Sequence, residues 1–260
     1  MKIREIEAYF ENLYPEDRKC AWDNDGLLLC PDRDREVTKV LTCLDVTFPA
    51  IEQAISQGCQ LIVSHHPLIF SPVKNISEDS IVGQKILLLL QAGVSLLSLH
   101  TRFDGALGGL NDRFARDLGI FPENGPPLLE EEPYIGGIGH LSVKTSPEEI
   151  SRIVSGILSV PVRLYSAQLD VLRIGYCCGS GKDLVTPCLL AGADAFIGGD
   201  IPYHTALSAV EEGMTVIDCG HHASEKSAAK IFRENLYALS TDLDVIAFVE
   251  DLGGEIVWNE

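Results

Sequence analysis

A repeated unit of helix, glycine and strand constrains the fold of this chain more than any other feature of its sequence. The unit occurs in "QAISQGCQLIVSHH", "LLLQAGVSLLSLHTRFD", "LLAGADAFIGGD" and "AVEEGMTVIDCGHH". A glycine directly after a helix adopts the left-handed conformation without steric cost, so it is the expected end of a helix. The apolar run after each glycine is typical of a buried strand. The alternation of helix and strand predicts βαβ units, a largely parallel sheet and therefore an α/β fold.

Each unit ends on a residue type that is useful in chemistry or in a tight turn. Seven positions separate the helix-ending glycine from this last residue in all four units, and the last residues are His65, His100, Gly199 and Gly220. In open α/β sheets, ligand sites lie outside the carboxyl ends of the strands. The four ends are therefore expected to contribute to a shared site.

Two adjacent histidines, His65 and His66, follow the apolar run "LIV" in "QLIVSHHPLIF". Neighbouring residues of an extended strand point to opposite faces, so these imidazoles share a face only if the strand has ended. Pro67 fits such an ending because it has no N–H for a sheet and favours extended geometry before it. The pair could serve as metal ligands, as acid–base groups or as part of a solvated turn.

Two further histidines have a carboxylate four residues later. His221 and Glu225 in "GHHASE" would share one face of a helix that begins at His221, whereas the neighbouring His222 would point about 100° away. His100 and Asp104 in "LHTRFD" have the same spacing at a strand end that leads into a loop. Imidazole with carboxylate suits zinc, manganese or iron, and a carboxylate can bridge two ions about 3.5–4 Å apart. The competing interpretation is that each histidine is an ordinary hydrogen-bonded group at a strand end.

Other polar residues are weaker candidates. Asp200 and His204 in "GGDIPYHTAL" could support the site or face a substrate, or else cap a helix and lie exposed on it. Asp45 ends a strand near the same site by topology, with no firmer role. His140 is expected to be an ordinary hydrogen-bonded histidine. The stretch "GYCCGSGKDL" lacks both the first glycine and the hydroxyl residue of a phosphate-binding loop.

Composition excludes several classes of function. The formal charge of −18 argues against a nucleic-acid partner, which needs basic residues for phosphate contacts, and leaves room for a cation site. No apolar stretch is long enough to span a membrane and the N-terminus has no signal-peptide core, so a cytoplasmic protein is expected. The eight cysteines include no Cys-x-x-Cys pair, which predicts reduced, mostly buried thiols rather than a thiolate zinc site.

The composition of one segment predicts a boundary between two lobes. The stretch "PENGPPLLEEEP", residues 122 to 133, is rich in proline, glycine and acidic residues. It predicts an N-terminal α/β lobe over residues 1–125, which carries His65, His66 and Asp104. The C-terminal α/β lobe is then expected over residues 126–260, with His221 and Glu225.

Five motifs, in order, resemble the signatures of the NIF3-like dinuclear metal-centre proteins, also called GTP cyclohydrolase I type 2 homologues. The motifs are "AWDNDGLLL", "SHHPLIF", "LHTRFD", "GGDIPYH" and "GHHASE". The resemblance implies two interlinked α/β lobes with mostly parallel or mixed sheets, in the short form without an inserted domain. It further implies a homohexamer built as a trimer of dimers and two divalent metal ions per chain. The ligands implied by the resemblance are His65, His66, Asp104, His221 and Glu225, with Glu225 bridging the ions. His100 is expected beside them as a ligand, as a catalytic group or as a residue that supports the ligands.

The function implied is a metal-dependent hydrolase that uses zinc, iron or manganese. If the family name holds, the substrate is GTP, which is converted to dihydroneopterin triphosphate and formate. The alternative is a non-enzymatic metal-binding or scaffold protein that acts through protein partners. Neither hypothesis involves a membrane, and nucleic acid is disfavoured as a partner.

Overall fold

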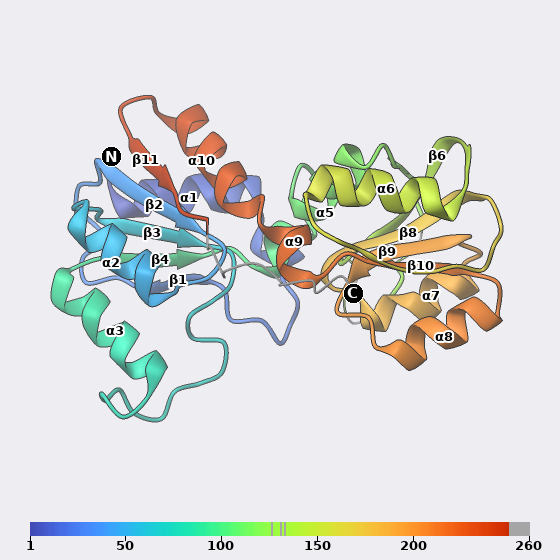
Figure 1. Cartoon of the computed structure of the whole chain (residues 1–260). Helices are drawn as coiled ribbons and strands as arrows, with labels where there is room; N and C mark the ends of the chain where they lie inside the picture. The colour runs from blue at the N-terminus through green and yellow to red at the C-terminus, as the bar shows by residue number, and fades with distance from the viewer. Residues whose placement is uncertain (126, 131, 133, 250–260) are drawn as a thin grey trace. The chain divides into compact units, whose positions relative to one another are not determined.

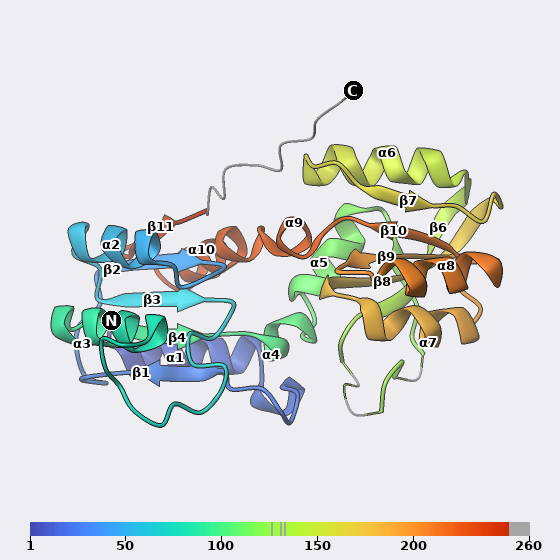
Figure 2. The same ribbon diagram turned by 60° about the horizontal axis from the view of Figure 1, so that its bottom comes forward.

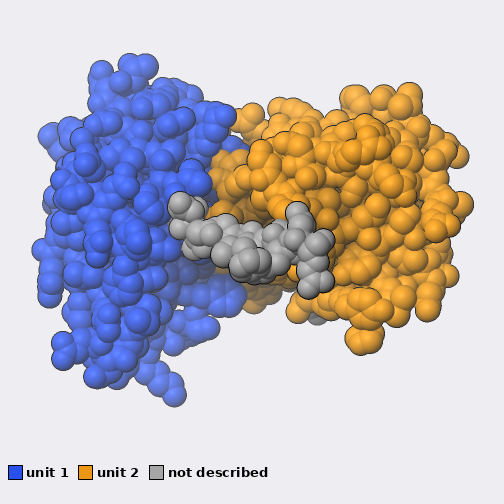
Figure 3. Space-filling view, viewed as in Figure 1, with its two compact units in different colours: residues 1–10, 24–100, 228–260 blue, residues 11–23, 101–227 orange. Residues whose placement is uncertain are grey.

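The computed structural model describes residues 1–125, 127–130, 132 and 134–249, and it divides into two compact units. Unit 1 consists of residues 1–10, 24–100 and the described part of 228–260, and unit 2 of residues 11–23 and 101–227 (Figure 3). Because the chain leaves and re-enters both units, the predicted interlinking of two α/β parts is confirmed.

Unit 1 is built on a five-stranded sheet with the order β1-β4-β3-β2-β11 (Figures 1 and 2). The pairs β11–β2, β2–β3 and β3–β4 are parallel, and β1 adds an antiparallel edge to β4. The elements are α1 (Ile3–Leu13, which continues into unit 2), β1 (Gly26–Leu29), β2 (Lys39–Cys43), α2 (Phe48–Ser56), β3 (Leu61–Ser64), α3 (Ile81–Ala92), β4 (Ser95–Ser98), α10 (Ala228–Leu239) and β11 (Asp244–Ala247).

Unit 2 is built on a six-stranded mixed sheet with the order β5-β6-β8-β9-β10-β7. The central pairs β8–β9 and β9–β10 are parallel, and the outer pairs are antiparallel. Its elements are η1 (Glu16–Arg18), α4 (Thr101–Asp104), α5 (Leu110–Asp117), β5 (Phe121–Pro122), β6 (Gly137–Thr145), α6 (Pro147–Leu158), β7 (Arg163–Tyr165), β8 (Val171–Ser180), η2 (Lys182–Leu184), α7 (Val185–Leu190), β9 (Ala195–Gly199), α8 (Tyr203–Glu211), β10 (Thr215–Asp218) and α9 (His221–Glu225).

Local sequence signals account for where these helices begin and end. The helix-ending glycines predicted from the repeated unit all have the positive φ that suits a residue without a side chain, and they are Gly58, Gly93, Gly192 and Gly213. Thr47 caps α2 by accepting a hydrogen bond from the N–H of Ala50. Ser146 caps α6 in the same way, with Glu149 as the donor, as its spacing predicts.

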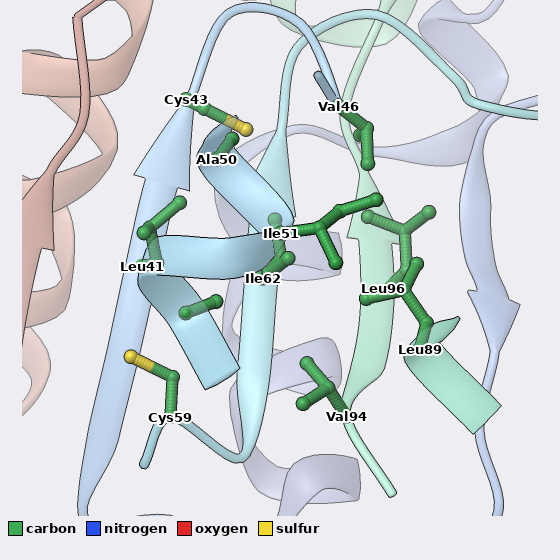
Figure 4. Close-up of a cluster of buried hydrophobic side chains, with 11 residues drawn as sticks. Leu41, Cys43, Val46, Ala50, Ile51, Cys59, Ile62, Leu89, Val94 and Leu96 are labelled. Atoms are coloured by element: carbon green, nitrogen blue, oxygen red, sulfur yellow. The ribbon is translucent and has the colours of Figure 1, made fainter. Parts of the chain in front are cut away.

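The sheet of unit 1 is buried on both faces, which explains its continuous apolar strands. Ile51 of α2 and Leu89 of α3 lie against Ile62 and Leu96 of the sheet (Figure 4). On the opposite face, helix α10 packs on β2, and the Thr42 hydroxyl donates to a carbonyl of that helix at 2.7 Å. Helices therefore cover both faces of this sheet, as a parallel sheet requires.

The sheet of unit 2 also packs against helices on both faces. Helices α7 and α8 contribute to a cluster of buried apolar side chains with Phe196 of β9 and Val216 of β10. Helices α5 and α9 pack on β8 from another side, where Asn111 accepts a hydrogen bond from the N–H of Cys178 at 2.8 Å.

The division of the chain differs from the predicted boundary at residues 125 and 126. That position lies inside unit 2, and residues 126, 131 and 133 of the proline-rich stretch lie outside the described residues. The reason is long-range pairing: β11, close to the C-terminus, pairs in parallel with β2 near the N-terminus. Conversely, α4 and α5 belong with the later strands, because α5 packs on β8.

Two predictions from composition can be compared with the structure. All eight cysteines are free thiols; Cys30 is partly exposed and the other seven are buried. Within the described part of the chain, no helix combines the length and apolar character needed to cross a bilayer.

Candidate metal centre

Three imidazoles gather at the carboxyl end of the sheet in unit 1. His65 directly follows β3, His100 lies two residues beyond β4, and these strands are parallel neighbours with Ser64 opposite Ser98. One ring nitrogen from each of His65, His66 and His100 lies within 4.8 Å of the others. The topology predicted from the repeated unit therefore brings these histidines together.

Hydrogen bonds fix which nitrogen of two of these rings is available. The Nδ1 of the fully buried His65 lies 2.9 Å from the carbonyl oxygen of Leu99, and the Nδ1 of His66 lies 2.8 Å from the Asp45 carboxylate. Carbonyl and carboxylate oxygens only accept, so both Nδ1 atoms donate. In a neutral imidazole the remaining Nε2 then carries the lone pair that a metal ion requires.

Two buried aspartates of the "AWDNDG" motif, for which the sequence predicts no role, hold the backbone around His100. Asp25 accepts a hydrogen bond from the N–H of His100 at 3.3 Å. Asp23 accepts from the N–H and the hydroxyl of Thr101, at 3.0 and 2.6 Å. Residues 101 to 104 therefore form the short helix α4 where a loop was predicted. The sequence signal that could have indicated this role is the occurrence of two aspartates beside a glycine, directly before the apolar run "LLL".

Unit 2 carries a second set of ligand-type side chains. Helix α9 begins at His221, as predicted, and places Nε2 of His221 2.9 Å from a carboxylate oxygen of the buried Glu225. The Nδ1 of His221 lies 2.8 Å from the Asp200 carboxylate. A carboxylate oxygen of Asp104, which is 9% exposed, lies within 4.8 Å of one of Glu225.

Close glycine packing makes room for Glu225. A side chain at Gly179, whose φ is +65°, would collide with the Oε1 of Glu225. A side chain at Gly199 would lie 2.6 Å from the backbone nitrogen of His221. Gly179 belongs to "GYCCGSGKDL", the stretch that does not match a phosphate-binding loop. The requirement for a small residue at this position becomes visible only in the folded chain.

The donor sets fit divalent cations. Nε2 of His221 and a carboxylate oxygen of Glu225 lie 2.9 Å apart, and both are donor types that bind divalent cations. Burial, together with the charges of Asp104 and Glu225, raises the pKa of the Cys177 thiol well above its usual value. The ligand groups formed by the described residues contain imidazole nitrogens and carboxylate oxygens, which suit zinc, manganese or iron.

The remaining sequence candidates lie elsewhere or support the ligands. His222 is in none of the ligand groups formed by the described residues. His204 is exposed and lines a groove with residues of α7 and α8, away from His221. Asp200 contacts His221 directly. His140 stacks on Phe121 as an ordinary surface histidine.

Comparison with known proteins identifies the family. The family model described as Duf34/NIF3 (NGG1p interacting factor 3) matches residues 1–251. The chain belongs to this family. This result confirms the resemblance that the five motifs indicate.

Members of the Duf34/NIF3 family resemble the chain over nearly its whole length. A "GTP cyclohydrolase 1 type 2 homolog" from Clostridium perfringens is 34% identical and covers 86% of this chain and 87% of its own. A protein named "GTP cyclohydrolase 1 type 2" from Helicobacter pylori is 30% identical, with 92% and 93% covered. The solved structure "Reduced HcgD from Methanocaldococcus jannaschii" is 28% identical, with a TM-score of 0.83 and 95% and 97% covered.

Proposed function

We propose that this chain is a dinuclear metal-dependent hydrolase that acts on GTP. The residues that would hold two divalent cations in this proposal are His65, His66, Asp104, His221 and Glu225. The observation that carries the proposal is the gathering of three imidazoles in unit 1 and of Asp104, His221 and Glu225 in unit 2.

The residues of the chain suggest how such a site would act. When bound, a pair of divalent cations supplies Lewis acidity and lowers the pKa of a water molecule. His100 is the proposed group that takes up the proton from the attacking water, because a neutral imidazole nitrogen can act as a general base. With GTP, two water molecules are taken up as the five-membered ring opens at C8 and formate is released. Rearrangement of the ribose and closure of a new ring then release one water and give dihydroneopterin triphosphate. The substrate is suggested by the names of the relatives.

The test is the release of formate from GTP by purified protein supplied with zinc, manganese or iron. We expect formate and dihydroneopterin triphosphate with the wild-type protein, and no turnover with Glu225→Gln, which lacks the carboxylate of this proposed ligand. Glu211→Gln, an exposed change on α8, is the matched control and should retain activity.

Other outcomes would point to other functions. Cleavage of phosphoesters or peptides without formate release from GTP would leave only the general hydrolase class. Binding of two cations without any turnover, with Glu225→Gln changing only metal content or thermal stability, would favour the metal-binding scaffold. A chain that binds no divalent cation would contradict the proposal as a whole.

A further inference from the structure

The same spacing of aspartate, glycine and histidine occurs once in each unit. Asp45 precedes Gly58 by thirteen residues and His66 by twenty-one, and the same two intervals separate Asp200 from Gly213 and from His221. The segments 45–66 and 200–221 can therefore be aligned without a gap. Gly220 then takes the position of His65, so only the segment in unit 1 has a histidine directly before its last residue.

The two segments also have the same local structure. Segment 45–66 leads from the end of β2 through α2 to the end of β3, and segment 200–221 leads from the end of β9 through α8 to the end of β10. Both strand pairs are parallel. Each aspartate and each histidine thus follow the carboxyl ends of two adjacent parallel strands.

The contact at the end of each segment is the same as well. A carboxylate oxygen of Asp45 lies 2.8 Å from Nδ1 of His66, and one of Asp200 lies 2.8 Å from Nδ1 of His221. Asp200 achieves this contact with a φ of 55°, in the left-handed region that is costly for a residue with a side chain. Unusual backbone conformations of this kind persist where the surrounding structure holds them.

We propose that Asp45 and Asp200 are matched positioning residues that prepare His66 and His221, one in each unit, to bind a divalent cation through Nε2. This inference rests on the proposed metal centre and deepens it. Each carboxylate accepts the Nδ1 proton, orients the ring and raises the basicity of the other nitrogen. His65 differs because the neutral carbonyl of Leu99 accepts the proton of its Nδ1. A charged carboxylate therefore faces Nδ1 of His66 and of His221, but not Nδ1 of His65.

The experiment is a titration of the metal-free full-length protein with zinc chloride, in competition with a chromogenic chelator. Replacement of such a partner carboxylate typically weakens metal binding by about 10–100-fold. We expect this loss in Asp45→Ala and in Asp200→Ala, and a smaller loss in Asp45→Asn and Asp200→Asn, whose amide oxygen can still accept the Nδ1 proton. Glu52→Gln and Glu211→Gln remove one exposed charge from α2 and α8, and they should bind zinc as the wild type does.

A purely structural role is distinguished by two further measurements. The thermal midpoint of the metal-free asparagine variants should match that of the wild type. In the zinc-loaded wild type, nitrogen-15 NMR should show a proton on Nδ1 of both rings, and the signal of the affected ring should change in each alanine variant.

The outcomes separate this inference from the proposed function. Wild-type zinc affinity in all four aspartate variants, with zinc bound by the wild type, would overturn the positioning role and leave the metal centre intact. Failure of the wild type to bind zinc would overturn both.

Discussion

At the scale of the residue, small side chains matter as much as the ligands themselves. Gly179 has a backbone φ of +65°, in the left-handed region, and lies directly against Glu225. Its N–H donates to the Ser224 hydroxyl at 2.9 Å. The Ser224 hydroxyl in turn donates to the carbonyl of His221 at 2.7 Å. Backbone and ligand therefore fit together with no space for an added methyl group.

We expect Gly179→Ala to weaken zinc binding and to lower the free energy of unfolding. The backbone cost of a side chain in the left-handed region is about 1–2 kcal/mol, and the new methyl group would displace Glu225. Zinc titration and urea denaturation measure the two effects. Gly58→Ala is the control, because its φ is +70° and nothing lies within 4 Å of the added atom. Equal zinc affinity in the two variants would contradict this account.

At the scale of the element, buried strands and helices hold thiols in apolar surroundings. Burial raises the pKa of Cys59 to about 11 and that of Cys188 to about 12, from an ordinary value of 9.0. The folded protein therefore keeps protons that the unfolded chain loses above pH 9. This contribution to stability is fully present below pH 9 and is lost as the pH rises through the folded-state values.

We therefore expect the urea midpoint of the protein to fall as the pH is raised from 9 toward 11. Cys59→Ala should show a smaller fall over this range, because one buried thiol no longer contributes to the difference in bound protons. Ser56→Ala changes an exposed residue of the same helix-to-strand segment and removes no titratable group, so it should leave the pH dependence unchanged. A midpoint that does not change over this range would show that the thiols ionise without unfolding the protein.

At the scale of the whole molecule, the two units are discontinuous in sequence. The strand β11 and helix α10 complete the sheet of unit 1, although they follow the whole of unit 2 along the chain. A division of the chain at residue 125 would separate these elements from the sheet that they cover.

A fragment of residues 1–125 is therefore not expected to fold cooperatively. It lacks α10 and β11 and carries α5 without the strand β8 on which that helix packs. Circular dichroism during thermal unfolding would show a broad, non-cooperative change, whereas the full chain should give a sharp transition. A sharp transition in the fragment would support an independent N-terminal lobe.

The predicted homohexamer is also a property of the whole molecule. Apolar side chains on α3 are exposed in the single chain, among them Ile81 at 58% and Leu90 at 42%. Such surfaces are often covered by another protein. We expect light scattering coupled to size-exclusion chromatography to give the mass of six chains, and a monomer at micromolar concentration would contradict the expectation.

Much of the fold was predictable because its signals are local. The glycines after the helices, the cap at Ser146 and the apolar runs of the parallel strands each act within a few residues. The candidate ligands could be found for the same reason, since His65, His100 and His221 stand at strand ends or helix starts that these signals define. The roles of Asp23 and Asp25 could not be found in this way, because their partners lie more than seventy residues away.

The sequence by itself determined the α/β class, the order of helices and strands and the residues with metal-binding chemistry, because periodicity and end signals depend on near neighbours. Only the tertiary structure decided which strands share a sheet, that Asp45 contacts His66 and Asp200 contacts His221, and that Glu225 needs a glycine beside it. These are contacts between segments far apart in the chain. They depend on the packing of whole sheets and helices, and no local pattern of residues encodes them.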